Sequence, residues 1–271
     1  MQNFICTTCG TQYEAVNNEP EQCMICTDER QYVLPSGQKW TTLNDMQTEK
    51  IWRNDIKQKS ERIVSITTTP KFAIGQTAYY IQTKELNILW DCITYLDSPT
   101  IAKLKQRGGI DLIAISHPHY YSTMNTWARM FDAPIYLHEH DAKWIAESSD
   151  YIQTWSGDTL QLTEDVSLHC LGGHFSGGTV LHWNKDNGTL FSGDIIQILP
   201  DLQWVSFMYS YPNLIPLPAK KVKQIANDVR TIPFKTMYGA FNRVITHDAN
   251  DIVQRSANRY IQALNGSLFS T

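Results

Sequence analysis

The hydrophobic and polar positions of the chain predict alternating strands and helices. Apolar runs of roughly four to eight residues, bounded by turn residues, are typical of strands. Such runs occur in RIVSITTTP, FAIGQTAYYIQT, NILWDCITY and DLIAIS, and again in APIYL, VSLHC and TVLHW. Helices are expected after Asp97-Ser98-Pro99, where a cap precedes a proline, and at 219–229 and 250–264, where the patterns are amphipathic. The chain therefore has the pattern of a mixed α/β protein.

One predicted strand, Ile110–Ser116, is followed directly by His117 and His119. Strand ends in open α/β sheets face the crevice where ligands bind. Because imidazole is a common metal ligand, two histidines one residue apart at such a place indicate a metal site. The ordinary alternative is a pair of partly buried, hydrogen-bonded histidines.

Two later stretches provide residues that suit the same site. LGGHFSGGTVLHW has His174 in a glycine-rich turn, and in TLFSGDII a short strand ends at Asp194. A histidine pair, a glycine-flanked histidine and a strand-ending Gly-Asp, in this order, resemble the metallo-β-lactamase superfamily. The resemblance implies an α/β fold, namely a four-layer αββα sandwich over about 63–264, preceded by a small N-terminal metal knuckle.

The resemblance also implies how metal is held. In the superfamily motif H-x-H-x-D-H, the first two histidines hold one metal, and the aspartate and last histidine hold a second. Here Tyr121 and Ser122 stand in place of that aspartate and that last histidine. We therefore predict a single, mononuclear metal centre. Its expected ligands are His117, His119, His174 and Asp194.

A single zinc with an open coordination position lowers the pKa of its bound water and polarises a carbonyl. The predicted function is hydrolysis of a small-molecule ester, lactone, thioester or amide by a metal-activated water that Asp194 orients. Tyr120 and Tyr121 are candidate donors to the developing oxyanion, or else they fill the space of the missing metal. A mononuclear non-haem iron dioxygenase and a non-catalytic, metal-stabilised binding protein are the alternatives.

Four cysteines near the start form two C-x-x-C pairs, Cys6, Cys9, Cys23 and Cys26. Four thiolates at this spacing can close a tetrahedron around a metal, as in zinc ribbons. The first pair resembles rubredoxin, so iron is possible here as well as at the central site. At the second pair Thr27 replaces the usual glycine, which favours zinc. We expect structural zinc, because so short a segment has little core of its own.

We divide the chain into the knuckle at 1–33, a connector at 34–61 and a metallo-β-lactamase-like domain at 62–271. The net charge is −4 with scattered Lys and Arg, so no nucleic-acid partner is expected. There is no apolar run of about twenty residues and no signal-peptide pattern at 1–10. We therefore expect a cytoplasmic protein without a membrane partner; the sequence does not predict the oligomeric state.

Other histidines and cysteines have more ordinary interpretations. His138 and His140 follow the strand APIYL and are expected to be partly exposed loop residues rather than ligands. His247 is expected to lie in a loop. Cys92 and Cys170 fall in strand-like runs and are expected to be small buried residues.

Two further features concern the surroundings of the metal. Asp91, at the end of a strand, is expected to support the metal loop through hydrogen bonds instead of binding metal. The segment 195–218 is rich in aromatic residues and proline and directly follows Asp194. It either forms the wall of a ligand pocket or covers an edge of the sandwich or an oligomer interface.

Overall fold

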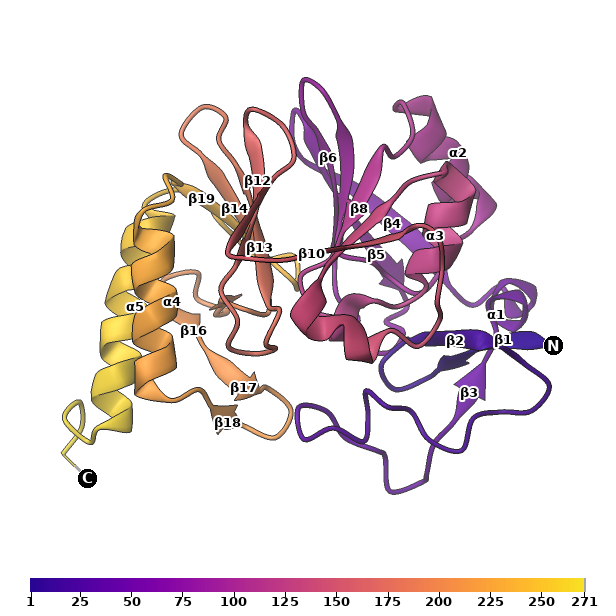
Figure 1. The fold of residues 1–271 in the computed structure, drawn as a ribbon, viewed down its shortest axis with the longest axis horizontal. Helices are drawn as coiled ribbons and strands as arrows, with labels where there is room; N and C mark the ends of the chain where they lie inside the picture. Colours follow the sequence, from indigo (N-terminus) through magenta and orange to yellow (C-terminus); the bar gives the residue numbers. More distant parts are fainter. Residues whose placement is uncertain (271) are drawn as a thin grey trace. The chain divides into compact units, whose positions relative to one another are not determined.

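The computed structural model describes residues 1–270, which form two compact units. The first unit comprises Met1–Leu137 and Asp141–Trp155. The second comprises His138–His140 and the described residues from Ser156 onward. Each unit contains a β-sheet with helices packed on it (Figure 1). The domain boundaries expected at 33 and 61 stay predictions.

The first unit is built on a seven-stranded sheet. Its strands are β4 (Arg53–Ser60), β5 (Ile63–Thr69), β6 (Ala78–Gln82), β7 (Asn87–Trp90), β8 (Leu112–Ala114), β9 (Ile135–His138) and β10 (Ile152–Trp155). They lie in the order β10-β9-β8-β7-β6-β5-β4. Neighbours from β4 to β7 pair antiparallel, whereas β8 pairs parallel with β7 and β9. Parallel pairing places the segments that follow β7 and β8 at the same edge of the sheet.

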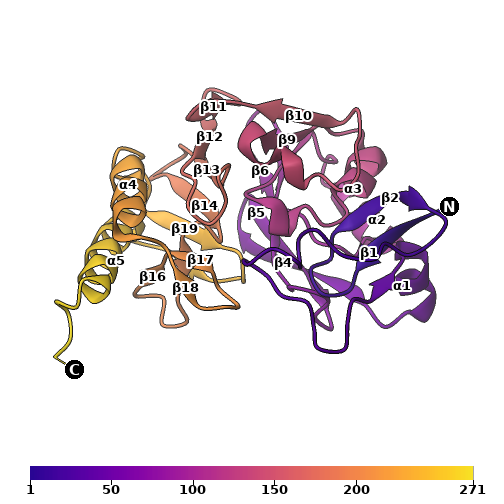
Figure 2. The ribbon, with the colours of Figure 1, turned by 60° about the horizontal axis from the view of Figure 1, so that its bottom comes forward.

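Helices α2 (Ser98–Gln106) and α3 (Met124–Phe131) lie beside this sheet (Figures 1 and 2). The predicted cap of α2 is confirmed, since the Asp97 carboxylate accepts a hydrogen bond from the backbone N–H of Thr100 at 2.9 Å. Two short 3₁₀ turns, η1 (Pro118–Tyr120) and η2 (Glu139–Trp144), follow β8 and β9.

The N-terminal segment forms a small sheet in the order β2-β1-β3. Its strands are β1 (Gln2–Cys6), β2 (Gln12–Val16) and β3 (Trp40–Thr41), and α1 (Leu43–Glu49) follows them. Ile5, Met46 and Tyr95 form a buried cluster that Trp52 and Phe72 flank. Trp52 thus fastens the N-terminal segment to the main sheet of its unit. The predicted connector at 34–61 contains β3, α1 and β4.

The second unit is built on a six-stranded sheet in the order β11-β12-β13-β14-β19-β20. Its strands are β11 (Thr159–Gln161), β12 (Val166–Cys170), β13 (Thr179–Trp183), β14 (Thr189–Gly193), β19 (Thr236–Gly239) and β20 (Val244–Ile245). Helices α4 (Ala219–Arg230) and α5 (Ala249–Leu264) lie side by side against it (Figures 1 and 2). Both helices were predicted, and their apolar faces complete one buried core with the sheet.

The aromatic segment 195–218 belongs to the second unit. It folds into two ribbons, β15 (Gln197–Ile198) with β16 (Val205–Ser206) and β17 (Met208–Ser210) with β18 (Ile215–Pro216). Val205, Phe207 and Leu217 are buried in the core of this unit. Part of the segment therefore belongs to the hydrophobic core. Other residues of the segment contact the site residues described below.

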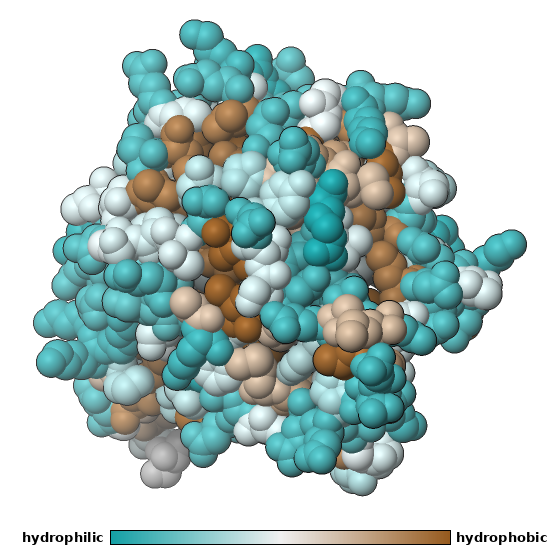
Figure 3. Space-filling view, turned by 45° about the vertical axis from the view of Figure 1, so that its right-hand side comes forward, coloured by the Kyte–Doolittle hydropathy of each residue, from teal (hydrophilic) through white to brown (hydrophobic). Residues whose placement is uncertain are grey.

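The surface seen in Figure 3 is mainly hydrophilic, with separate hydrophobic patches. Within residues 1–270, no helix combines the length and the apolar character needed to cross a membrane.

Candidate metal centre

The loop after β8, residues 115–123, holds the first two predicted ligands and is called the histidine loop. His117 and His119 are buried, with exposed fractions of 1% and 2%. Their ring centroids lie 5.1 Å apart and their planes meet at 71°. Two imidazoles bound to one tetrahedral metal at about 2.0 Å have centroids about 5 Å apart. The geometry of this pair therefore suits a shared metal.

Hydrogen bonds from the neighbouring strand end hold this loop. Asp91 Oδ1 accepts from the backbone N–H of Ser116 at 2.8 Å, and the Asp91 N–H donates to Ala114 O at 2.9 Å. Asp91 adopts a left-handed conformation, with φ of 59°, which an aspartate tolerates better than most residues. Ser116 Oγ in turn lies 2.8 Å from Nδ1 of His117. The supporting role expected of Asp91 is confirmed by its hydrogen bond.

Tyr120 and Tyr121 occupy different surroundings within the first unit. The Tyr120 ring packs against the His117 imidazole, with the centroids 4.3 Å apart. The Tyr121 hydroxyl donates to Asp141 O over a long 3.4 Å. Burial raises the pKa of Tyr121 well above its ordinary value, so its phenol keeps its proton. Both tyrosines remain predicted, not demonstrated, oxyanion donors.

Ser122, at the position of the family's last motif histidine, is part of a buried hydrogen-bond network. Its hydroxyl accepts from Gln76 Nε2 at 3.0 Å and donates to Cys92 O at 3.4 Å. Gln76 Nε2 also donates to Cys92 O at 2.7 Å. Protein groups thus surround the Ser122 side chain at the place where a second-metal ligand would be.

His174 lies in the second unit, in the turn between β12 and β13. Gly172 and Gly173 precede it with φ of 64° and 92°, conformations that favour glycine. A Cβ on Gly173 would lie 2.9 Å from Ile225 Cδ1, so the turn approaches α4 closely. The Nδ1 atom of His174 lies 3.1 Å from Met208 O. Because a carbonyl only accepts, Nδ1 carries the proton, and Nε2 keeps the lone pair that a metal needs.

Asp194 follows the last residue of β14 and is also in the second unit. It is buried, and Gln197 Nε2 donates to its Oδ1 at 3.4 Å. The Tyr211 hydroxyl donates to the Asp194 carbonyl at 3.1 Å, and the Tyr211 ring lies 5.5 Å from that of His174. Tyr211 and Met208 were expected only as members of the aromatic segment 195–218, with no contact to a ligand assigned to either. Their place in an aromatic segment next to a ligand was the only signal.

The four predicted ligands of the central site therefore come from both units. His117 and His119 belong to the first unit, and His174 and Asp194 belong to the second. The last candidate, His247, has a side chain that is 74% exposed, in agreement with its predicted loop position.

The four N-terminal cysteines, called the cysteine knuckle, lie together in the first unit. All are buried, and their Sγ atoms lie within 4.8 Å of one another. Cys6 Sγ is 3.6 Å from Cys26 Sγ, and Cys9 Sγ is 3.5 Å from Cys23 Sγ. Gln38 Nε2 donates to Cys6 Sγ at 3.0 Å, as expected for a thiolate ligand. The predicted four-cysteine cluster that could hold a metal is confirmed.

The two cysteine pairs of the cysteine knuckle differ in the residue that follows each pair, Gly10 after the first and Thr27 after the second. Gly10 has φ of 87°, and its N–H donates to Cys6 O at 2.8 Å. At the other half, Thr27 N–H donates to Cys23 O at 3.0 Å, and the Thr27 hydroxyl donates to the same carbonyl. Hydrogen bonds from the Cys23 and Cys26 thiols lower the pKa of Cys6, whereas burial raises the pKa of Cys9. The four thiols therefore differ in the direction of their pKa shifts, and binding of a metal would release the protons that they carry.

The cysteine knuckle touches the histidine loop. Gln12, just after the first cysteine pair, donates its N–H to Ser122 O at 3.0 Å. Its side-chain Oε1 accepts from Thr126 Oγ1 at 2.9 Å. Gly10 O accepts from Thr94 Oγ1 at 3.2 Å, and a Cβ on Gly10 would lie only 2.2 Å from that hydroxyl. The chain between the cysteine pairs is therefore hydrogen-bonded to the histidine loop at Ser122 and to the flanking residues Thr94 and Thr126.

Two expectations about other residues need correction or refinement. Cys170, expected to be buried, is partly exposed at the end of β12. It is the last residue of its strand, where the chain turns into the glycine loop, so the sheet no longer covers it. His138 is buried and His140 exposed, so only His140 fits the expectation of an exposed loop residue.

Comparison with known proteins agrees with this arrangement. The family model described as Metallo-beta-lactamase superfamily matches residues 73–240, which is more than half of the chain. The chain therefore belongs to the metallo-β-lactamase superfamily. It is 53% identical, over the full length of both chains, to a Bacillus subtilis (strain 168) protein described as Uncharacterized protein YmaE.

Solved structures with the same fold include two metallo-β-lactamases from named bacteria. FIM-1 from Pseudomonas aeruginosa, in its mono-zinc form, is 11% identical with a TM-score of 0.55, over 77% of this chain and 96% of its own. FEZ-1 from Legionella gormanii is 14% identical with a TM-score of 0.53, over 79% of this chain and 97% of its own. At these identities the likeness establishes the mixed α/β metallo-β-lactamase fold, as predicted.

Proposed function

We propose that the protein is a metal-dependent hydrolase that cleaves a small-molecule ester, lactone, thioester or amide with water activated at a single metal. The proposed ligands are His117, His119, His174 and Asp194. The observation that carries the proposal is the geometry and hydrogen bonding of the three imidazole rings. His117 and His119 have the ring separation of two ligands on one metal, and Met208 O fixes the proton of His174 on Nδ1.

Several observations support one metal at this centre rather than two. Tyr121 and Ser122 replace two ligands of the family's second metal, and Ser122 is held by Gln76 and Cys92. His247, the remaining late histidine, is exposed in its loop. The fold is also known with a single zinc, since FIM-1 was solved in a mono-zinc form.

A bound zinc would supply Lewis acidity, which polarises the substrate carbonyl and makes water a better nucleophile. The protein's own groups then orient the reactants. The Asp194 carboxylate would hold the attacking water and accept its proton, while Tyr211 fixes the backbone of Asp194. The protonated Tyr121 phenol could exchange its long bond to Asp141 O for a bond to the developing oxyanion.

The same proposal assigns zinc to the cysteine knuckle and a cytoplasmic location to the protein. Buried thiols that are to bind metal must stay reduced, which is usual in that compartment. The knuckle zinc would have a structural role because it lies among residues that anchor the N-terminal sheet.

The test is a panel of chromogenic esters, thioesters, lactones and amides assayed with the wild-type protein, His174→Ala and His247→Ala. We expect turnover of at least one class by the wild type, a loss of about 10³-fold in His174→Ala, and no loss in the exposed-loop control His247→Ala. Equal turnover by wild type and His174→Ala, or no turnover of any class by zinc-loaded wild type, would contradict the proposal. Iron at the centre together with oxygen uptake would instead favour the dioxygenase alternative.

The tyrosine role has its own test. If Tyr121 donates to the oxyanion, Tyr121→Phe lowers kcat by about 10-fold or more with little change in KM. Turnover that stays unchanged in Tyr121→Phe would remove this role and leave Tyr121 as a space-filling residue.

A further inference from the structure

A third cluster of metal-binding side chains lies wholly within the second unit. His138, His140 and Cys170 each place one ligand atom within 4.8 Å of the other two. The His138 and His140 ring centroids are 4.6 Å apart, with the planes at 62°. This separation is close to the value of about 5 Å for two imidazoles on one tetrahedral metal. None of the three belongs to the proposed catalytic centre.

His138 is held in the orientation of a metal ligand. Its Nε2 lies 3.0 Å from Gly157 O, and a carbonyl can only accept, so Nε2 carries the proton. The lone pair is therefore on Nδ1, where a bound metal would replace the long 3.2 Å bond that Nδ1 accepts from the His140 N–H. An imidazole that donates one N–H to a backbone carbonyl while its other nitrogen binds metal is the usual arrangement in metal sites.

Cys170 adds a thiol at a place where solvent and metal can reach it. It ends β12 and is partly exposed, with Sγ 3.7 Å from Ser176 O. His140 is exposed as well. A metal held by these three side chains would therefore keep a coordination position open to water, unlike the four-thiol cysteine knuckle.

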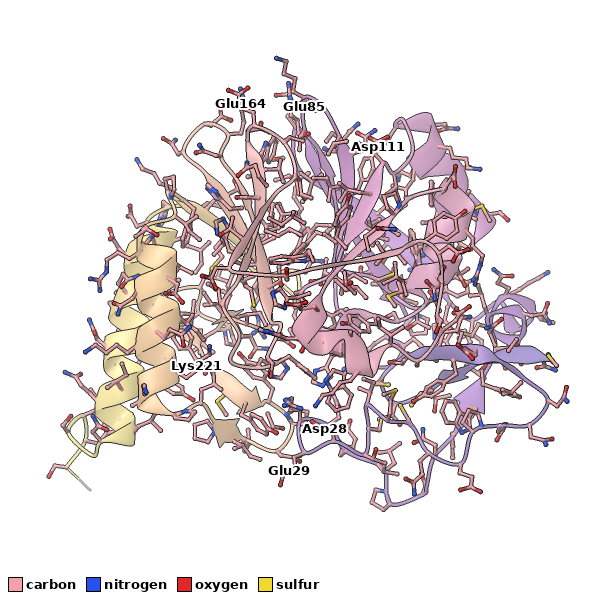
Figure 4. All side chains as sticks on the ribbon, in the orientation of Figure 1. Asp28, Glu29, Glu85, Asp111, Glu164 and Lys221 are labelled. Carbon is pink, nitrogen blue, oxygen red and sulfur yellow. The ribbon has the colours of Figure 1, made fainter. Side chains whose placement is uncertain are left out.

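The surrounding charge favours a cation. Cys170 lines a cavity of about 550 Å³ that also has four carboxylates in its wall, Asp158, Glu164, Asp165 and Asp228. Lys221 on α4 carries the opposite charge, and burial lowers its pKa while a Cys170 thiolate raises it. Figure 4 shows Lys221 at α4 and Glu164 at the far end of the second unit's sheet. The charges of Glu139 and Asp158 act on the His138 imidazole and favour a bound cation there.

We propose that His138, His140 and Cys170 form a separate, solvent-accessible site for Zn²⁺ in the second unit. Two imidazoles and one thiolate are a donor set that suits zinc and its spectroscopic substitute Co²⁺, not the oxygen-seeking Mg²⁺ or Ca²⁺. Binding releases the Cys170 thiol proton to solvent, and water completes the coordination.

The test adds Co²⁺ to the purified full-length protein with its cysteine knuckle already occupied by zinc. A thiolate bound to Co²⁺ gives an intense near-ultraviolet charge-transfer band, whereas the proposed catalytic centre has no thiolate. We expect the wild type to develop this band up to about one equivalent of Co²⁺, and Cys170→Ser and His140→Ala to lose it. His247→Ala, which removes another exposed histidine, and Cys92→Ser, which removes a thiol outside the cluster, should keep it.

The catalytic variant His117→Ala separates this inference from the proposed function. It should keep the band, because the two sites share no ligand. The inference is overturned if the wild type shows no band, if the band persists in Cys170→Ser, or if it disappears only in Cys6→Ser and therefore reports the cysteine knuckle. His140→Ala is an exposed substitution, so its loss of the band would not stem from misfolding.

Discussion

The cysteine knuckle and the central histidine set take their ligands from the chain in opposite ways. All four thiols come from residues 6–26, lie in one unit, and have Sγ atoms within 4.8 Å of one another. The proposed catalytic ligands are spread from His117 to Asp194 and come from two units. Hydrogen bonds from other segments hold the histidine loop at Ser116 and the ring of His174.

This difference separates two uses of a metal. A short segment with little core depends on its metal to stay folded, so metal binding there contributes to folding. In the second unit, a large hydrophobic core surrounds the segments that carry His174 and Asp194, so a metal at the central set is expected to contribute chemistry and not folding. Loss of the knuckle metal should therefore affect stability, and loss of the central metal should affect turnover.

The largest expected effect tests this separation directly. Cys6→Ser should lower the free energy of unfolding by about 3 kcal/mol or more, because it breaks a four-thiolate site that supports the N-terminal sheet. His117→Ala should cost about 1–2 kcal/mol, since it removes a ligand from a pre-formed loop. Urea unfolding of both variants provides the comparison. Equal losses of unfolding free energy, or a larger loss in His117→Ala, would contradict the distinction between a structural and a catalytic metal.

A substitution that leaves all ligands in place tests how the histidine loop is held. Asp91→Ala removes the acceptor of the Ser116 N–H and should weaken metal binding at the central site by about 10–100-fold. Asp91→Asn is the matched control, because it keeps an Oδ1 acceptor and also tolerates φ of 59°. Competition with a chromophoric chelator measures both. An affinity in Asp91→Ala equal to that of the wild type would show that the loop holds its shape without this bond.

A smaller effect on turnover is expected from a substitution of Tyr211, in the second unit. Tyr211→Phe removes the hydroxyl that donates to the carbonyls of Asp194 and Ser206, at 3.1 and 3.3 Å. We expect kcat to fall by about 10-fold with the metal retained, because Asp194 is less firmly positioned. Steady-state kinetics with metal analysis on the same sample checks this. A normal kcat would mean that the Tyr211 hydroxyl is not needed to position Asp194.

The smallest effect comes from His169, which is not a ligand in any of the three metal clusters. Burial, and to a smaller extent His182, lowers the pKa of His169 to about 4. The unfolded residue titrates near 6.5, so between about pH 6.5 and 4 protons bind the unfolded chain preferentially. Stability is fully present above about pH 6.5 and falls as the pH is lowered to 4. His169→Gln should flatten this decline by about 1 kcal/mol, an amount reduced for partial exposure. Thermal melts across this range measure it, and an unchanged slope would count against the assignment.

Local chemistry explains what could be predicted from the sequence. The strand runs, the Asp97 cap and the C-x-x-C spacing each depend on residues close together in the chain. The metallo-β-lactamase fold followed from motif order, and the family match supports it. The support from Asp91 was also predictable, because β7 and β8 are parallel neighbours whose ends meet.

Contacts between segments far apart in the chain explain which features could not be predicted from the sequence. No pattern showed that Met208 O would fix the His174 ring, or that Tyr211 would reach the Asp194 carbonyl. The contacts of Gly10 with Thr94 and of Gln12 with the histidine loop were equally hidden. Cys170 was misjudged because a strand run suggests burial, although the last residue of a strand can lie beyond its cover.

Metal content measured by elemental analysis tests the central claim most directly. Wild type, His117→Ala and Cys6→Ser are purified without added metal and compared per chain. The account predicts that each variant loses about one zinc relative to wild type, that Cys6→Ser also loses stability, and that His117→Ala loses turnover. A His117→Ala protein with the zinc content of wild type would contradict the account, because the central histidines would then hold no metal.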